Sequence, residues 1–430
     1  MNLKLAVQAV LVSSFLPGSF LAAQALESAC ETNSSPSGIV LCAARLHPLV
    51  RRQEALRARA RADAEAAVVY PNPEIEGEVS SGPSGEFAYL HPIELGDRRE
   101  LRGDEARKRE SAAAARLELV RQDAALETIE LLFRLRQSFE NTRMLSEARD
   151  SFGVALNRLA RSAVLTPSRR AELLTVRLAL RTSEQRLALL ETERLHMEQR
   201  LELILGSRLE SEPVLSALVR RDQTWPEDVP GELATPEVEA SRLEAAAAAA
   251  HARLEESQVW PVLRIGPRVG YETASESDLL GNRSRRGEFD YGVAFRLELP
   301  LYNQNAGAIE SAREMSRASS IDHQTLTDRI AAEAARLHRS YRAYRVQLSR
   351  SAPPENVVQD GRLIAGYLAR GIIPPGTLVE YYRTQLDYVR DYQELEIAAL
   401  QSLWRLRALK GQILDPEVLR ELDASPGDAS

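Results

Sequence analysis

Residues 64–80, "AEAAVVYPNPEIEGEVS", begin as an alanine-rich helix, meet Pro71 and Pro73, and continue as an alternation of charged and apolar residues. Proline ends a helix because it lacks the backbone N–H and its ring clashes with the preceding turn. Residues 253–271, "RLEESQVWPVLRIGPRVGY", repeat the order of helix, aromatic residue, proline and strand. The sequence therefore predicts the same change from helix to strand twice.

An internal duplication organises the whole chain. Pro48 and Pro73 are 25 residues apart, and so are Pro236 and Pro261. Further on, "HPIELGDRRELRGDEA" (91–106) matches "LPLYNQNAGAIESA" (299–312), and "LARSAVLTPSRRAEL" (159–173) matches "LARGIIPPGTLVEY" (368–381). Similarity in both motif and spacing is typical of repeat architectures.

Each half is predicted to run helix, strand, strand, long helix, turn, helix, which gives a mainly α fold with a small β part. The first half has a long helix over 97–160 and a second over 168–205; Pro353 and Pro354 interrupt the corresponding helix of the second half. The predicted segments are a signal peptide (1–25), an extension (26–47), a first repeat (48–211), a linker (212–235), a second repeat (236–415) and a tail (416–430). The strands fall at about 73–95 and 261–302, and the helix turns at 159–168 and 368–376.

The strand segments alternate between two kinds of residue. In "FDYGVAFRLELPL" (289–301), odd-numbered residues are aromatic or aliphatic and even-numbered residues are charged, small or proline. A half-buried sheet of a soluble protein alternates in the same way. Strands of about ten residues flanked by Tyr70, Trp260 and Tyr302 favour a membrane-spanning sheet with an aromatic girdle. "SGPSGE" (81–86) and "ASESDLLGNRSRRGE" (274–288) are the expected outer turns.

If the apolar faces contact lipid, the opposite face lines a channel. The charged residues expected there are Glu74, Glu76, Glu78, Glu94, Arg264, Arg268, Asp290, Arg296 and Glu298. Six acids against three bases predict a pore that favours cations. Four strands leave open edges, which lipid does not tolerate, and single-chain barrels start at about eight strands. We therefore expect a homotrimer with a twelve-stranded barrel.

The N-terminus is typical of an exported protein. Lys4 precedes an apolar stretch, and Ala23-Gln24-Ala25 fits the small-x-small cleavage pattern of a secretory signal. The only cysteines are Cys30 and Cys42. An oxidising compartment favours a disulfide between them. Lipidation of Cys30 is the second interpretation, since Glu27-Ser28-Ala29 lacks the preferred apolar residue.

The order and spacing of these motifs resemble the TolC family of outer-membrane efflux proteins, most nearly its heavy-metal (cobalt-zinc-cadmium resistance) branch. The resemblance rests on "NPEIEGEV" (72–79), "LPLYNQNAGAIESA" (299–312) and "LARGIIPPGTLVEYYRTQLDY" (368–388), and it extends over about 48–414. It implies a trimeric twelve-stranded barrel in the outer membrane, continued by a periplasmic α-barrel of coiled-coil helices. The implied partners are a periplasmic adaptor (membrane fusion) protein and an inner-membrane pump.

The resemblance also implies two sites away from the strands. The helix turns would be the tips that dock the adaptor, with Arg161 and Ser162 in one and Arg370 and Gly371 in the other. Ser162 stands where the family usually has glycine. Glu380 matches the first of two acidic residues that often ring the periplasmic aperture, whereas Arg383 replaces the second.

Enzymatic and nucleic-acid functions find no support in the residues. The net charge of -7 argues against a general nucleic-acid binder. The six histidines show no paired helical spacing, and neither a glycine-rich phosphate loop nor a nucleophile elbow is present. We therefore expect no enzyme, no cofactor and no bound metal.

The function predicted is a passive exit duct for heavy-metal cations, driven by a partner pump. A type I secretion or drug-efflux channel is the alternative within transport, because a wide duct need not contain a selective site. A soluble periplasmic coiled-coil scaffold is the alternative from another class. The amphipathic strands argue against that scaffold.

Overall fold

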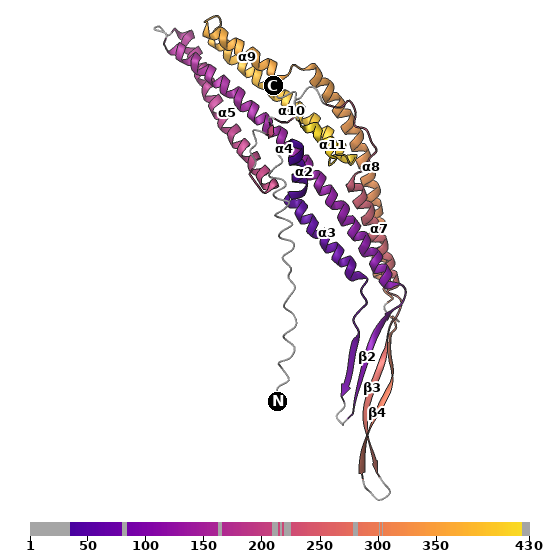
Figure 1. The fold of residues 1–430 in the computed structure, drawn as a ribbon. Helices are drawn as coiled ribbons and strands as arrows, with labels where there is room; N and C mark the ends of the chain where they lie inside the picture. Colours follow the sequence, from indigo (N-terminus) through magenta and orange to yellow (C-terminus); the bar gives the residue numbers. More distant parts are fainter. Residues whose placement is uncertain are drawn as a thin grey trace, which may run out of the picture. The chain divides into compact units, whose positions relative to one another are not determined.

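The computed structural model describes residues 35–79, 84–161, 166–208, 214–215, 217–218, 225–277, 283–300, 302 and 304–423. Figure 1 shows the elements along the chain. The chain divides into two compact units. Unit 1 consists of Met1–Val50, Arg121–Glu232 and Ala334–Ser430, and unit 2 of Arg51–Val120 and Leu233–Glu333.

Unit 2 contains one antiparallel sheet with the strand order β1-β2-β3-β4. The strands are β1 (Glu74–Val79), β2 (Gly85–Glu94), β3 (Val262–Ser277) and β4 (Arg283–Glu298). β2 pairs with β3, so the two halves of the sequence repeat join in the middle of the sheet. At Gly266 the strands approach so closely that a Cβ would lie 1.7 Å from the Tyr89 carbonyl oxygen. Only glycine fits at such a contact.

The second hairpin is longer than the sequence indicated. β2 pairs with β3 as far as Tyr271, whereas β3 and β4 remain paired to Ser277 and Arg283. Most of residues 274–288, expected as an outer turn, therefore lies in strands. Two antiparallel strands satisfy each other's backbone hydrogen bonds, so pairing continues where the apolar alternation has ended.

Unit 2 contains all of α7 (Pro236–Ser257) and nearly all of α3 (Pro48–Ala67). It also contains residues 98–120 of α4 (Arg98–Ala160) and residues 306–333 of α8 (Ala306–Arg350). Asp97 precedes α4 and Asn305 precedes α8, both with positive φ. Asp and Asn tolerate this left-handed conformation better than other residues with side chains. The two residues occupy matching places in the sequence repeat, so the duplication extends to the backbone.

Unit 1 is built from the remaining parts of α4 and α8 with α5 (Pro167–Leu205), α9 (Pro354–Ala369) and α10 (Pro375–Leu409). The gap between Arg350 and Pro354 confirms the predicted break in the second long helix. Phe152, Val176, Leu368, Leu378 and Tyr382 form one buried cluster that joins α4, α5, α9 and α10.

A second core in unit 1 brings the two ends of the described chain together. α2 (Pro36–Leu46) packs with α11 (Pro416–Leu419) and the 3-10 turn η1 (Arg420–Leu422) around Val40, Trp404 and Leu419. The Ser37 amide and hydroxyl donate to the Asp423 carboxylate at 2.9 and 2.6 Å. Residues 35–47 of the predicted extension and 416–423 of the predicted tail thus belong to this core.

Proline marks the start of most helices. The residues at this first position are Pro36, Pro48, Pro167, Pro236, Pro354, Pro375 and Pro416. Proline suits this position because the first N–H of a helix has no partner within it and the fixed φ is already helical. Side chains of Ser35, Thr166, Thr235 and Asp415 accept hydrogen bonds from the first-turn amides.

Candidate functional site

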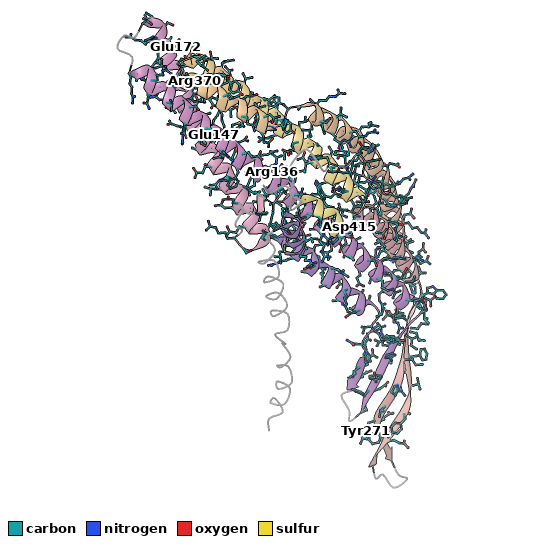
Figure 2. The ribbon with its side chains drawn as sticks, turned by 45° about the horizontal axis from the view of Figure 1, so that its top comes forward. Arg136, Glu147, Glu172, Tyr271, Arg370 and Asp415 are labelled. Carbon is teal, nitrogen blue, oxygen red and sulfur yellow. The ribbon has the colours of Figure 1, made fainter. Side chains whose placement is uncertain are left out.

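The sheet of unit 2 has one apolar face that is open to its surroundings. We call it the apolar face; its exposed members are Ile75, Phe87, Tyr89, Ile93, Ile265, Val269, Tyr271, Phe289, Tyr291, Val293, Phe295 and Leu297. Tyr291 and Phe295 remain 74% and 73% exposed. Tyr271 is labelled on this sheet in Figure 2. An apolar surface that crosses four strands marks contact with a membrane or another protein.

The opposite side of the same sheet is the charged face. It contains the predicted channel residues Glu74, Glu76, Glu78, Glu94, Arg264, Arg268, Asp290, Arg296 and Glu298, which alternate with the apolar residues along the strands. Each arginine contacts two carboxylates on other strands. The contacts are Arg264 with Glu74 and Glu298, Arg268 with Glu86 and Asp290, and Arg296 with Glu74 and Glu76.

Two charged residues differ from the expectation. Glu86 belongs to the charged face, where it lies 3.3 Å from Arg268, but it was assigned to the outer turn. The sequence signal for this placement is the separation from Glu94 on the same strand: residues an even number of positions apart lie on one face of a strand. Glu94 itself pairs with Arg102 of α4 at the end of β2, so one predicted channel charge is neutralised by a helix.

The outer strands leave the sheet open on both sides. Within the described residues, β1 pairs only with β2 and β4 pairs only with β3. An unpaired strand edge exposes a row of N–H and C=O groups that another strand can satisfy. β1 has 6 residues and β4 has 16, so only part of β4 can pair with a β1 of another copy.

The ends of α4 and α9, which lead into the two predicted helix turns, are in contact in unit 1. Arg158, near the end of α4, donates from Nη1 to the Leu368 carbonyl oxygen of α9 at 2.6 Å. Gly371, in the second turn, has a positive φ of 78°. Arg161 and Arg370 are exposed at their turns, and Figure 2 labels Arg370. Ser162 lies outside the described residues.

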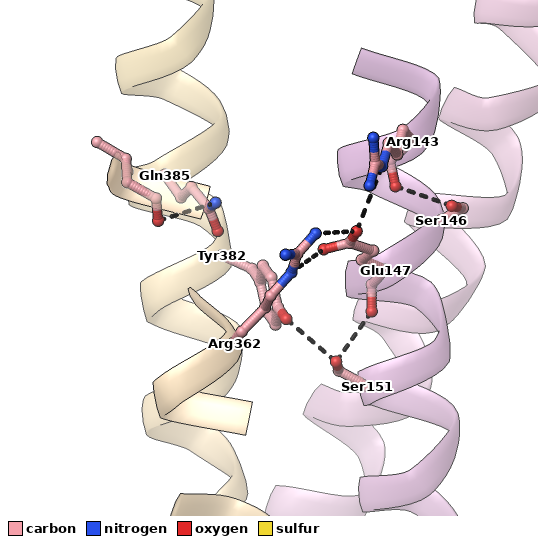
Figure 3. Close-up of polar contacts among 8 residues, drawn as sticks. Arg143, Ser146, Glu147, Ser151, Arg362, Tyr382 and Gln385 are labelled. Atoms are coloured by element: carbon pink, nitrogen blue, oxygen red, sulfur yellow. Dashed lines mark hydrogen bonds and ion pairs between the residues drawn. The ribbon is translucent and has the colours of Figure 1, made fainter. Parts of the chain in front are cut away.

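A polar contact joins α9 and α10 to α4 (Figure 3). Arg362 donates to both Glu147 oxygens, with Nη2 2.8 Å from Oε1 and Nε 3.3 Å from Oε2. Beside it, the Ser151 and Tyr382 hydroxyls are 3.1 Å apart. Burial raises the pKa of Tyr382 above its usual value. No local sequence pattern marks these residues, because the partners are 215 and 231 residues apart in the chain.

The two predicted aperture residues lie on α10. Glu380 and Arg383 are both exposed and are three residues apart, which places them on neighbouring positions of one helical surface. In a single chain both side chains are therefore exposed on the surface of α10, where another copy of the chain would have access to them.

The remaining chemistry of the chain is limited. Among the described residues, no group of three or more His, Cys, Asp or Glu side chains is arranged to hold a metal ion. No helix in the described ranges is long and apolar enough to cross a membrane. Cys42 lies in α2, whereas Cys30 and the signal segment lie outside the described residues, so the disulfide and the signal peptide stay predictions.

Taken together, long helices and a four-stranded antiparallel sheet with an exposed apolar face give this chain the fold of TolC-family outer-membrane channels. It is similar to CusC, with a TM-score of 0.66, 13% identity and coverage of 88% of this chain and 92% of CusC. The CmeC channel of Campylobacter jejuni gives a TM-score of 0.68 at 14% identity, with coverage of 90% of this chain and 90% of CmeC. The open MtrE channel of Neisseria gonorrhoeae gives a TM-score of 0.64 at 13% identity, with coverage of 88% of this chain and 89% of MtrE. At these identities, the likeness establishes the fold.

No protein-family model matches the sequence, and no curated protein is significantly similar to it. The heavy-metal branch named in the sequence analysis is therefore not resolved from the other channels of this fold.

Proposed function

We propose that this chain is the outer-membrane exit duct of a tripartite efflux system. Three copies would form a twelve-stranded barrel, and the helices would continue it as a periplasmic tunnel. The duct would passively conduct heavy-metal cations that a periplasmic adaptor and an inner-membrane pump deliver. No chemical reaction is assigned to the chain.

The main observation behind this proposal is the contrast between the apolar face and the charged face of one sheet whose edges are open. An apolar face left in water would be a liability for a soluble protein, whereas in a bilayer it is the lipid contact. Closure of the sheet with strands of other copies satisfies both edges and places the charged face around a lumen. The helix-only scaffold alternative gives no role to this surface.

The surplus of carboxylates supports a cationic cargo. Each arginine of the charged face is shared between acids on other strands, and Glu78, Glu272 and Glu288 add further negative charge to it. Fixed negative charge in a confined space raises the local concentration of cations. Metal cations are therefore favoured over anionic cargo.

The helix turns are the proposed docking tips for the adaptor. Arg161, Arg370 and Gly371 lie at exposed turns of unit 1, and the contact between Arg158 and Leu368 joins the ends of α4 and α9 that lead into these turns. A paired tip presents a fixed surface to a partner. Glu380 and Arg383 are proposed to surround the aperture, where carboxylates and guanidinium groups of different copies would alternate.

Adjacent residues of β4 provide a matched test of membrane insertion. Phe295→Arg places a charge on the apolar face, and Ala294→Arg places the same charge on the charged face. We expect Phe295→Arg to reduce outer-membrane trimers, since an arginine in the bilayer centre costs about 2–4 kcal/mol, and Ala294→Arg to assemble normally. Membrane fractionation and crosslinking provide the measurement. A wild-type monomer in the soluble periplasmic fraction would refute the proposal and favour the scaffold.

The cargo is tested separately in the cell. A deletion strain should lose resistance to heavy-metal salts, and the wild-type chain should restore it while Phe295→Arg should not. A panel of drugs is the comparison. Loss of drug resistance with unchanged metal resistance would contradict the metal assignment and leave the duct in place.

A further inference from the structure

Arg99 lies beside the apolar face and, among the described residues, forms no ion pair with a carboxylate. The guanidinium of Arg99, in the first turn of α4, lies over the Tyr70 ring at 4.1 Å from its centroid. The Tyr70 ring contacts His91 with 6.4 Å between centroids. His91 lies between Tyr89 and Ile93 on the apolar face of β2, so the Arg99 guanidinium is held at the edge of that face.

The neighbouring arginines Arg98 and Arg102 form hydrogen bonds or ion pairs with other groups of the chain. Arg98 donates to the carbonyl oxygens of Ser257 and Gln258 at 3.1 and 2.9 Å. Arg102 is paired with the Glu94 carboxylate. Across the described ranges of the chain, Arg99 has the Tyr70 ring as its contact and no carboxylate neutralises it. Its charge is therefore available to a ligand from outside the chain.

We propose that Arg99, supported by Tyr70 and His91, binds the headgroup phosphate of an anionic glycerophospholipid. This inference rests on the proposed function, because it requires the apolar face to contact a bilayer. The acyl chains would lie along Val69, Ile75 and Ile93, which are exposed next to the cluster. Arginine binds phosphate through two parallel N–H donors, and an aromatic ring beneath it limits the motion of the guanidinium.

The site is restricted to the first repeat. In the alignment of "HPIELGDRREL" with "LPLYNQNAGAI", Arg99 corresponds to Gly307. The aromatic residues of the second repeat, Trp260 and Tyr302, are exposed as Tyr70 is, but they have no arginine at the matching position. A trimer would therefore hold one such site per chain, and its aromatic girdle alone would not explain any preference for anionic lipid.

Lipid retention by the detergent-solubilised full-length trimer tests the site, with phosphatidylglycerol and phosphatidylcholine as probes and native mass spectrometry as the readout. The wild type should retain phosphatidylglycerol in preference to phosphatidylcholine. Arg99→Gln should lower that preference about fivefold per site, the effect of one basic residue near an anionic membrane surface. Arg57→Gln, which removes an exposed arginine from α3, should leave it unchanged.

Tyr70 provides a second, independent variant. Tyr70→Leu should reduce the preference without changing the charge of the chain, and Tyr70→Phe should preserve it because the ring remains. Equal lipid preference in wild type, Arg99→Gln and Tyr70→Leu would overturn the site, even if all three assemble as trimers. A wild-type chain that does not enter membranes would overturn the proposed function as well. Tyr70→Leu decides the question if Arg99→Gln does not assemble.

Discussion

Arg362 of α9 holds Glu147 of α4 through two hydrogen bonds, one from Nη2 and one from Nε. The ion pair raises the pKa of the Arg362 guanidinium further above its usual value. Exposed ion pairs contribute little to global stability. The geometry instead fixes where α9 lies against α4, directly beside the hydroxyl contact between Ser151 and Tyr382.

Replacement of Arg362 should loosen α9 without unfolding the chain. Arg362→Gln removes both hydrogen bonds to Glu147, so we expect faster amide hydrogen exchange in α9 and little change in thermal unfolding. Arg390→Gln is the control, because the ion pairs of Arg390 among the described residues are with nearby acids of its own helix, Asp387 and Asp391. Equal exchange in α9 for both variants would show that the pair does not position the helix.

Gly371→Val should impair efflux while barrel assembly remains normal. The positive φ disfavours any residue with a side chain by roughly 1–2 kcal/mol, and a Cβ would lie 2.5 Å from Nη2 of Arg158. The tip contact between Arg158 and Leu368 would then be displaced. Resistance of the complemented deletion strain and the yield of trimer provide the readouts.

Gly366→Ala is the matched control for that variant. Gly366 lies in α9 and a Cβ there meets nothing within 4 Å, so the substitution should favour the helix by about 1 kcal/mol. Resistance should be unchanged. If Gly371→Val conferred normal resistance at normal expression, the turn would have no docking role.

The open barrel should prefer cations, most strongly at low salt, where screening is weak. Replacement of Glu74, Glu76 and Glu78 by Gln should weaken this preference, whereas Arg296→Gln should strengthen it by removing a positive charge. Reversal potentials of single channels in planar bilayers under a salt gradient measure both effects. A wild-type preference for anions would contradict the assignment of the charged face to the lumen.

Tyr341 should make unit 1 sensitive to strong alkali. Its hydroxyl donates to the Pro226 carbonyl oxygen at 2.6 Å, and burial raises its pKa from 10.0 to about 12. Because the folded state favours the neutral phenol, this contribution to stability is complete below pH 10 and is lost as the pH rises through about 12.

Tyr341→Phe tests this contribution. The variant should lose about 1 kcal/mol at neutral pH from the missing hydrogen bond and should show a smaller further loss in alkali. Burial also raises the pKa of Tyr381 and Tyr382, so the comparison is between wild type and variant across the same pH range. Parallel stability curves would contradict the role of Tyr341.

Local patterns were sufficient to predict most of the elements. The alternation of Tyr291, Val293 and Phe295 identified a strand with two unlike faces. The helices expected over 97–160 and 168–205 are observed over Arg98–Ala160 and Pro167–Leu205. The duplication identified matching elements in both halves. These signals are local because strand periodicity, helix starts and breaks depend on residues close in sequence.

Contacts between distant segments were not predictable in this way. The pairing of Glu94 with Arg102 depends on how the end of β2 meets the first turns of α4, and the pairing of Arg362 with Glu147 joins different repeats. Similarly, the burial of Val214 and Leu218 in the core of unit 1 places part of the expected linker among packed side chains. Each depends on tertiary packing, which a periodic pattern does not specify.

Ser37 and Asp423 are 386 residues apart in sequence, and the hydrogen bonds between them complete a core that includes Leu419 and Leu422. A polypeptide released from the ribosome before these last core residues lacks one of the segments that pack against α2. Maturation of unit 1 must therefore wait for the arrival of the C-terminal end in the same compartment. Truncated products leave part of the apolar surface of α2 uncovered, and exposed apolar surface of this kind is recognised by chaperones and proteases.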